Sequence, residues 1–211
     1  GSRRPDRAQT DPTQEENPMK KNPMSESYAF PSDLDRRTYL DYLRFVVERI
    51  HTVVVATVDD ADHPVTAAID MMDCDGQSLY FLTAKGKAFY DRLKKRGAIA
   101  LTGMKGADTL SCVAISIQAK VREIGPGKLP ELFEKNPYMN QIYPNAQSRG
   151  VLTVFQAYQG VGEWFDLSRL PIERDSFAFG GAEAPEQGYL ITDHCTGCGL
   201  CAEKCPQSCI D

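Results

Sequence analysis

The chain lacks any long apolar run, and no stretch of its 211 residues approaches the roughly 20 apolar residues that a membrane-spanning helix requires. Its basic residues are scattered and its formal net charge is −5, so it lacks the basic patch typical of nucleic-acid-binding proteins. The first residues contain no apolar signal region. We therefore expect a cytoplasmic protein with no membrane span and no nucleic-acid partner.

Histidine and tryptophan are scarce, with three residues and one residue, and none of the histidines stands in a recognisable ligand context. Cysteine is almost absent from most of the chain. Only Cys74 and Cys112 precede Cys195, whereas five of the seven cysteines lie from Cys195 onward. This distribution indicates a metal site in a reducing compartment rather than a disulfide framework.

The C-terminal cysteines form a compact motif. Its sequence is Cys195-Thr-Gly-Cys198-Gly-Leu-Cys201-Ala-Glu-Lys-Cys205-Pro206. The C-x2-C-x2-C-x3-C-P spacing is typical of bacterial ferredoxin runs that bind a [4Fe–4S] cluster. The alternatives are a four-cysteine zinc site, which usually splits its ligands into two separated pairs, and a disulfide pair. We predict that Cys195, Cys198, Cys201 and Cys205 bind a cluster.

The identity of the fourth ligand stays open. In two-cluster ferredoxins the fourth cysteine of each run ligates the cluster of the other run, whereas this sequence has one run. Three candidates remain: Cys205 of the same chain, Cys205 of the partner subunit, and Cys209.

Composition divides the chain into three parts. Residues 1–28 are rich in Pro, Asp, Glu, Arg, Gln and Asn, so we expect a disordered tail, with Gly1-Ser2 as a cloning scar and Met19 or Met24 as the natural start. Residues 29–182 have the apolar content of one folded domain. Residues 183–211 form the iron–sulfur segment.

The central part reads as mainly β structure, a β-barrel with flanking helices. We expect one helix over 32–50 and two shorter helices over 88–95 and 128–136. The expected strands cover 52–58, 64–72, 78–83, 98–104, 111–122, 151–157 and 160–167. Residues 73–76 read as a turn, which would make the first three strands an antiparallel meander.

A short basic loop precedes the helix over 88–95. Thr83-Ala84-Lys85-Gly86-Lys87 offers a hydroxyl, two ammonium groups and a helix N-terminus, which together suit a phosphate. The alternative is an ordinary solvated loop.

Several segments resemble the FMN-binding split barrel of the pyridoxamine 5′-phosphate oxidase superfamily. The resemblance spans residues 35–182 and rests on the order of strands and on three sequences, namely Leu82-Thr83-Ala84-Lys85-Gly86-Lys87-Ala88, Gly162-Glu163-Trp164-Phe165-Asp166-Leu167-Ser168 and Phe177-Ala178-Phe179-Gly180-Gly181. The segment Tyr189-Leu190-Ile191-Thr192-Asp193-His194-Cys195 resembles half of a two-cluster ferredoxin. Together they resemble a subgroup of split-barrel flavoproteins that carry a C-terminal 4Fe–4S segment.

The resemblance implies an antiparallel split barrel that forms a homodimer, with one FMN per subunit at the interface. The implied FMN-binding residues are Val65, Thr66 and Ala67 beside the isoalloxazine ring, Thr83, Lys85 and Lys87 at the phosphate, and Leu82 next to them. Many family members have a basic residue on the second strand, whereas Asp70 is the only charge there. We therefore do not expect true pyridoxamine phosphate oxidase activity.

The two motifs predict an FMN-dependent oxidoreductase in which the cluster relays single electrons between the flavin and a ferredoxin-like partner, acting on a small-molecule substrate. The alternatives are a non-catalytic redox or iron sensor and a haem-binding protein. No catalytic acid or base is identified. Tyr138, Tyr143 and Arg149 lie in a segment that could cover a flavin. Trp164 reads as a core residue, with stacking near the flavin as the alternative.

Overall fold

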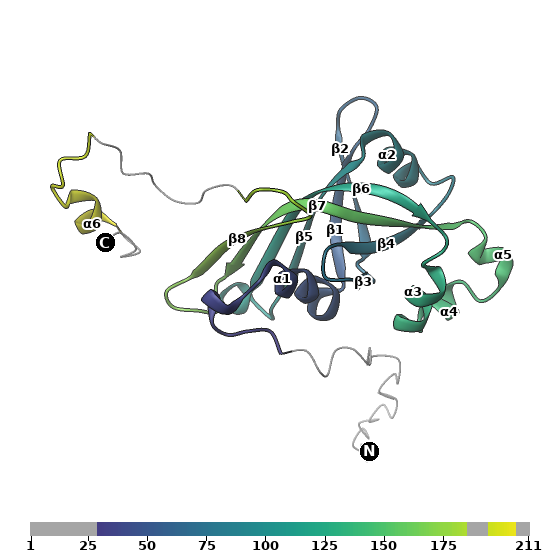
Figure 1. The fold of residues 1–211 in the computed structure, drawn as a ribbon, viewed down its shortest axis with the longest axis horizontal. Helices are drawn as coiled ribbons and strands as arrows, with labels where there is room; N and C mark the ends of the chain where they lie inside the picture. Colours follow the sequence, from purple (N-terminus) through teal and green to yellow (C-terminus); the bar gives the residue numbers. More distant parts are fainter. Residues whose placement is uncertain (1–28, 185–193, 206–211) are drawn as a thin grey trace, which may run out of the picture.

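A computed structural model describes residues 29–184 and 194–205 (Figure 1). The tail predicted over 1–28 and residue Cys209 lie outside the described residues. Among the helices that the structure describes, none is both long and apolar enough to cross a membrane.

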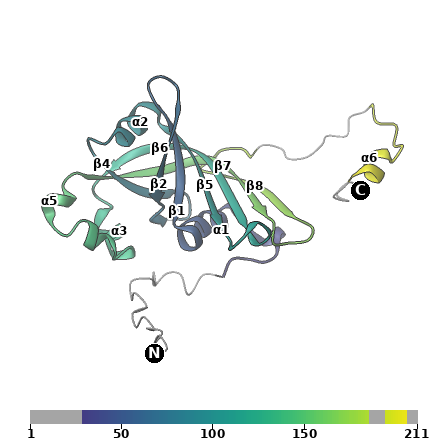
Figure 2. The same ribbon diagram turned by 180° about the vertical axis from the view of Figure 1, so that it is seen from behind.

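The fold is an antiparallel sheet that curls into a half-barrel (Figure 1). The described residues contain eight strands: β1 (Thr52–Val58), β2 (Pro64–Asp70), β3 (Asp73–Cys74), β4 (Leu79–Ala84), β5 (Ala98–Lys105), β6 (Val113–Gly125), β7 (Leu152–Asp166) and β8 (Glu173–Phe179). Their order is β2-β1-β5-β6-β7-β4-β3, with β8 also paired to β7. Seen from behind, β2, β1, β5 and β6 follow one another across the sheet (Figure 2).

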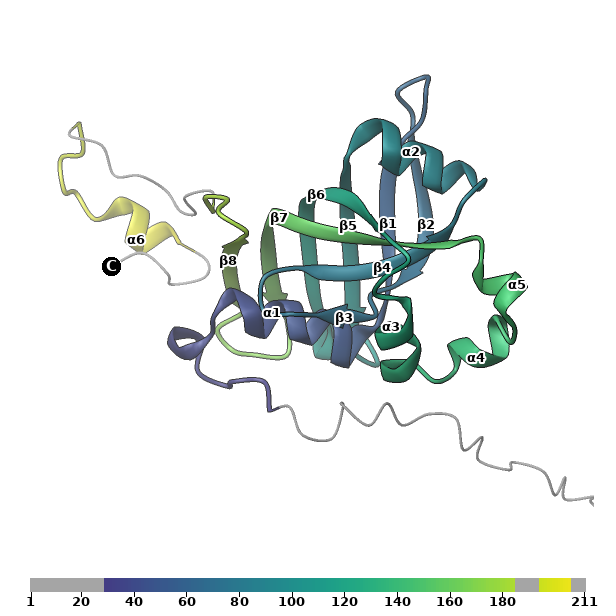
Figure 3. The same cartoon turned by 45° about the vertical axis from the view of Figure 1, so that its right-hand side comes forward.

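Few helices accompany the sheet in the described part of the chain. They are α1 (Tyr39–Phe45), α2 (Ala88–Arg96), α3 (Leu129–Lys135), α4 (Met139–Ile142), α5 (Ala146–Arg149) and α6 (Leu200–Lys204). Helices α1 and α2 lie at opposite ends of the barrel, while α3, α4 and α5 follow one another beyond the ends of β4 and β7 (Figure 3).

The single helix expected over 32–50 is wrong, because this segment forms three helical pieces. A 3-10 turn covers Leu34–Arg36, α1 begins after a capping box of Thr38 and Asp41, and a π-helical turn covers Val46–Ile50. The cap at Thr38 has extended backbone geometry, and this interrupts the helix there. The apolar face of α1 is buried as expected.

The expected three-stranded meander is also wrong. Strands β1 and β2 form a hairpin, but β3 replaces part of the expected turn and pairs with β4, which itself pairs with β7. The chain crosses between two hydrophobic clusters at Met71 and Met72, since each methionine is buried in a different one. Buried Asp73 is then held by lysines of the α3 region rather than by solvent.

The two strands expected over 151–157 and 160–167 are one continuous strand, β7. Its first half pairs with β4 and its second half with β8, while β6 pairs along its other edge with a bulge at Lys120/Val121. Gly162 lets β7 approach β8 closely, because a Cβ atom there would overlap the ring of Phe177. Trp164 is 2% exposed and packs against Phe45, which confirms its core role.

Candidate cofactor sites

The loop between β4 and α2 exposes two cations beside a helix N-terminus. Lys85 and Lys87 are exposed, and neither forms an ion pair with another described residue. Lys87 is the N-cap of α2 and makes no side-chain capping bond, so N–H groups of the first turn face outward. Gly86 has a φ of 85° and open space at its Cβ position. The loop is therefore an accessible, electropositive segment at a helix N-terminus.

Leu82 and Thr83 lie on opposite faces of β4. Leu82 packs against the second hydrophobic cluster, around Tyr80 and Leu152. Thr83 is 6% exposed and lies opposite Thr153 of β7, in the register that also places Phe81 in the main core. Of the residues predicted at the phosphate, the structure thus brings Lys85 and Lys87 to the surface and buries the Thr83 side chain.

Strand β2 ends the described sheet and has a free backbone edge. Two hydrogen bonds flank its ladder with β1: Asp59 N donates to His63 O at 2.9 Å, and Met71 N donates to His51 O at 2.8 Å. Hydrogen-bonded and non-bonded pairs alternate in an antiparallel ladder, so odd-numbered residues of β2 bond to β1. Even-numbered Thr66 therefore turns its N–H and C=O toward the free edge.

Helix α2 connects the basic loop to the start of β2. Arg92 Nε donates to Thr57 Oγ1 at 2.8 Å, and Thr57 Oγ1 donates to the carbonyl oxygen of Val65 at 3.3 Å. At the tip of the β1–β2 hairpin, Lys95 Nζ lies 2.6 Å from Asp60 Oδ1. The loop and the first half of β2 are consequently held at the same end of the barrel (Figure 1).

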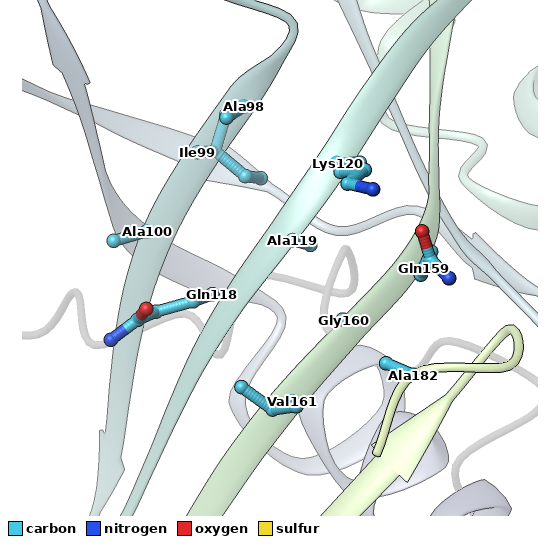
Figure 4. A pocket seen from close by; sticks show the side chains of 10 residues that line it. All are labelled: Ala98, Ile99, Ala100, Gln118, Ala119, Lys120, Gln159, Gly160, Val161 and Ala182. Atoms are coloured by element: carbon cyan, nitrogen blue, oxygen red, sulfur yellow. The ribbon is translucent and has the colours of Figure 1, made fainter. Parts of the chain in front are cut away.

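The outer face of the sheet carries small side chains and two adjoining hollows. One, of about 490 Å³, is lined by Ala98, Ala100, Gln118, Lys120, Val161 and neighbouring residues (Figure 4). The second, of about 600 Å³, shares three of these residues and extends along the same strands. Within the described residues, none of those predicted to bind FMN lines either hollow. The hollows are surfaces of β5, β6 and β7, not the predicted FMN site.

The cysteine run has the backbone that a cluster-binding loop needs. Gly197 and Gly199 have φ values of 67° and 73°, and a Cβ atom would meet nothing at either position. Gly197 N donates to Cys195 Sγ at 3.4 Å. The N–H of Leu200, followed by the Thr196 hydroxyl, lowers the pKa of Cys198 and so favours its thiolate, the form that binds iron. The residues present fit an iron–sulfur cluster.

The four cysteines are not gathered around one point. Cys195, Cys198 and Cys201 are exposed, Cys205 is partly buried, and α6 carries Cys201. Among the described residues, no three metal-ligating side chains are close enough to hold an ion. The ligand set therefore remains a prediction from the spacing.

The sequence reasoning missed one polar constellation. His51, Tyr138 and Asp70 come together although they lie far apart in the chain, and they form two hydrogen bonds of 2.7 Å. The only sequence signals were the isolated charge of Asp70 on its strand and the tyrosine in the segment after α3.

Family models match most of the described chain. The pyridoxamine 5′-phosphate oxidase model matches residues 40–161, and the 4Fe–4S binding domain model matches residues 189–211. The chain therefore belongs to the pyridoxamine 5′-phosphate oxidase family, with its split-barrel fold, and carries a 4Fe–4S binding domain at its C-terminal end. No curated protein matches the chain.

Solved structures share the barrel at low sequence identity. A NimC/NimA family protein of Clostridium acetobutylicum is 17% identical, with a TM-score of 0.53, over 67% of this chain and 90% of that one. A protein of the same organism related to general stress protein 26, of the pyridoxinephosphate oxidase family, is 17% identical, with a TM-score of 0.52, over 66% and 93%. A haem-binding protein of Mycobacterium smegmatis is 11% identical, with a TM-score of 0.53, over 69% and 59%.

These similarities show a common fold. The family match and the iron–sulfur match together indicate a redox role for the chain.

Proposed function

We propose that this protein is an FMN-dependent oxidoreductase in which a [4Fe–4S] cluster relays single electrons to or from the flavin. The observation that carries the proposal is the joining, in one chain, of a split barrel of this family and a ferredoxin-type cysteine run. Bound FMN would exchange one or two electrons, whereas the cluster would exchange one. The pair would therefore connect two-electron chemistry at the flavin with one-electron transfer through the cluster. A reducing cytoplasm suits such a centre.

The loop before α2 is the proposed phosphate site. Lys85 and Lys87 supply charge that no described carboxylate neutralises, and α2 supplies uncapped N–H groups beside them. A phosphate would be stabilised by the two ammonium groups and by the positive end of the helix. Thr83 and Leu82 would shape the floor of this site from β4.

The free edge of β2 is the proposed contact for the flavin ring, with Val65, Thr66 and Ala67 along it. Thr66 offers an N–H and a C=O to the edge, and planar ring systems with alternating donors and acceptors can pair with such groups. Val65 and Ala67 use their backbone groups in the ladder with β1 and would hold the edge in place. The link from Val65 through Thr57 to α2 fixes this edge relative to the phosphate loop.

A second copy of the chain is the proposed cover for this open site. The described barrel does not enclose the β2 edge, whereas its outer sheet face carries exposed apolar residues such as Val54, 52% exposed, and Met104, 64% exposed. Cross-strand pairs place Ala68, Val54 and Thr102 in one row of this face. An exposed apolar face of small residues suits close packing in a homodimer, with FMN at the interface.

Asp70 argues against the oxidation of pyridoxamine phosphate. Many family members have a basic residue near Ala67 on this strand, whereas here the only charge on the strand is the Asp70 carboxylate, which would repel a phosphorylated substrate. The substrate class thus differs from that of the enzyme after which the family is named.

Lysine variants test the proposed flavin site. Lys85→Ala and Lys87→Ala should each weaken FMN binding roughly tenfold or more, because each removes a charged hydrogen bond to phosphate. Lys105→Ala is the matched control, since Lys105 is an exposed lysine at the end of β5. Fluorescence titration of flavin-depleted protein measures the affinity. Equal affinity in all three variants would contradict the site.

Absorbance of the anaerobically purified protein separates the proposed function from a haem-binding role and from a cluster-only sensor. Flavin bands with a broad iron–sulfur shoulder support the proposal. A Soret band, or a cluster without flavin, would contradict it.

A further inference from the structure

Three polar side chains from distant parts of the chain form a hydrogen-bonded line. His51 Nε2 lies 2.7 Å from Tyr138 Oη, and Tyr138 Oη donates to Asp70 Oδ2 at 2.7 Å. Thr52 Oγ1 donates to the other carboxylate oxygen of Asp70 at 2.6 Å. His51 follows the π-helical turn, Asp70 ends β2, and Tyr138 precedes α4.

The chemistry of the three groups fixes the direction of the line. An ionised carboxylate only accepts hydrogen bonds, so the single hydroxyl proton of Tyr138 goes to Asp70. Tyr138 must then accept from His51, which means that His51 Nε2 carries a proton. Burial, reinforced by the bond to Asp70, raises the pKa of Tyr138 well above its ordinary value, so the phenol stays protonated. The line is therefore a directed chain of donors from His51 to Asp70.

The backbone of His51 is held in a conformation that L-residues rarely adopt, with a φ of 67° and a ψ of −67°. Its N–H donates to Val46 O at 2.7 Å and its C=O accepts from Met71 N at 2.8 Å, so both sides of the residue are fixed. Strained residues and π-helical turns concentrate at functional sites. Glycine would adopt this conformation without strain. The presence of histidine at this position therefore points to a role for its imidazole side chain.

Both end residues of the line reach solvent, and the line is bent at Tyr138, since His51 Nε2 lies 3.6 Å from Asp70 Oδ2. The side chains of His51 and Asp70 are 28% and 31% exposed. Asp70 turns its backbone N–H and C=O toward the free edge, as Thr66 does, and lies three residues beyond Ala67 on the same strand.

We propose that His51, Tyr138 and Asp70 form a proton relay that serves the flavin edge of β2. The inference rests on the proposed function. Iron–sulfur clusters deliver electrons one at a time and carry no protons, whereas two-electron reduction of a flavin also takes up a proton. A flavin fed by a cluster therefore takes its proton from another source, and a hydrogen-bonded chain of protein groups beside the ring is one such source.

Each cycle of the relay moves one proton from solvent to the flavin ring. A protonated His51 gives its Nε2 proton to Tyr138 Oη while the Tyr138 proton passes to Asp70 Oδ2, and Asp70 passes a proton to the ring. His51 then regains a proton from water. For two electrons received from the cluster, one proton enters from solvent, and the three side chains return to their starting state.

The first test measures flavin reduction in the full-length holoprotein. Reduced methyl viologen donates single electrons without protons, and stopped-flow absorbance in H2O and D2O follows flavin reduction separately from cluster reduction. Tyr138→Phe should slow flavin reduction by about tenfold or more, as loss of a positioned proton donor does, and should abolish its solvent isotope effect. Tyr39→Phe, in an exposed tyrosine of α1, should leave both unchanged.

His51→Gly separates the relay from a structural role. Glycine accepts the backbone of this position, so the variant should keep its fold and its FMN while flavin reduction slows as in Tyr138→Phe. A second readout needs no flavin: the hydrogen-bonded His51 Nε2–H should give a slowly exchanging proton resonance that is lost in Tyr138→Phe.

The outcomes distinguish the two claims. If Tyr138→Phe and His51→Gly retain FMN and are reduced at the wild-type rate with the wild-type isotope effect, the relay is wrong and the proposed function stands. If the wild-type protein binds no FMN, the proposed function fails and the relay fails with it.

Discussion

Asp73, a buried carboxylate on the two-residue strand β3, lies 2.8 Å from the ammonium group of Lys135, and Lys128 lies 2.9 Å from its other oxygen. Lys128 is the N-cap of α3 and Lys135 is its last residue, so this carboxylate fastens the segment after β6 to the strand before β4. Asn136 adds a bond from its side-chain amide to the carbonyl of Met72 at 3.0 Å. These contacts fix the position of the start of the segment that contains Tyr138, relative to β3.

Replacing Asp73 should destabilise the barrel. Asp73→Asn should lower the free energy of unfolding by about 3 kcal/mol, because it removes the buried carboxylate between two largely buried ammonium groups and leaves them only the partly exposed Glu131. Denaturant unfolding, followed by the fluorescence of the buried Trp164, measures the change. Asp60→Asn is the control, since its ion pair with Lys95 is exposed and should contribute almost nothing. Similar losses in both variants would contradict the role given to Asp73.

Glu131 should give the barrel a small stability increment that acid removes. Hydrogen bonds from Lys128 and Lys135 lower the pKa of Glu131 from 4.5 to about 2. A folded-state pKa below the unfolded one stabilises the fold above pH 4.5, and the increment disappears as the pH falls toward 2. Solvent screening keeps it small because the side chain is 45% exposed.

Unfolding of cluster-free protein at a series of pH values tests this contribution. Glu131→Gln should be less stable than wild type at pH 6, and the two curves should converge toward pH 2. A constant difference across the range would contradict the assignment.

Close packing between β7 and β8 should make Gly162 intolerant of a methyl group. Gly162→Ala should destabilise the protein by about 1 to 3 kcal/mol, because the new Cβ atom would overlap Phe177 in a fully packed interior. Gly127→Ala should be nearly neutral, since open space surrounds that position. Thermal or denaturant unfolding measures both, and a neutral Gly162→Ala would show that β8 can move aside.

Serine variants should identify the cluster ligands. Cys195→Ser, Cys198→Ser, Cys201→Ser and Cys205→Ser should each lose most of the bound iron and sulfide, because serine oxygen replaces a thiolate poorly at a [4Fe–4S] cluster. Cys209→Ser should retain the cluster. Iron and sulfide counts after anaerobic reconstitution measure the outcome. Loss in Cys209→Ser with retention in Cys205→Ser would reverse the assignment of the fourth ligand.

The sequence predicted those strands of the barrel that have a clear pattern of apolar or β-branched residues within the strand itself. The β-branched run of β1 and the alternation of β6 gave their positions, and the helix α2 was also anticipated. The pairing of β3 and β4 with β7 could not be read from hairpin rules, because it depends on which hydrophobic cluster buries Met71 and which buries Met72. Likewise, Tyr158 and Gln159 continue β7 where the sequence suggested a break.

The candidate sites likewise divide into those that a short sequence motif identifies and one that only the tertiary structure brings together. Short motifs identified the basic loop and the cysteine run, since each lies within a few consecutive residues. The alignment of His51, Tyr138 and Asp70 depends on tertiary structure, because a turn after α1, the end of β2 and the segment after α3 must meet. No spacing rule relates residues so far apart.

The most direct test of the proposed function is cluster-to-flavin electron transfer in the anaerobically purified protein. After counting FMN, iron and sulfide per subunit, a limiting single-electron reductant should reduce the cluster first and the flavin afterwards within the same molecule. The account predicts that the flavin band bleaches as the cluster absorbance recovers, at a rate independent of protein concentration. A reduced cluster beside a flavin that stays oxidised would contradict it.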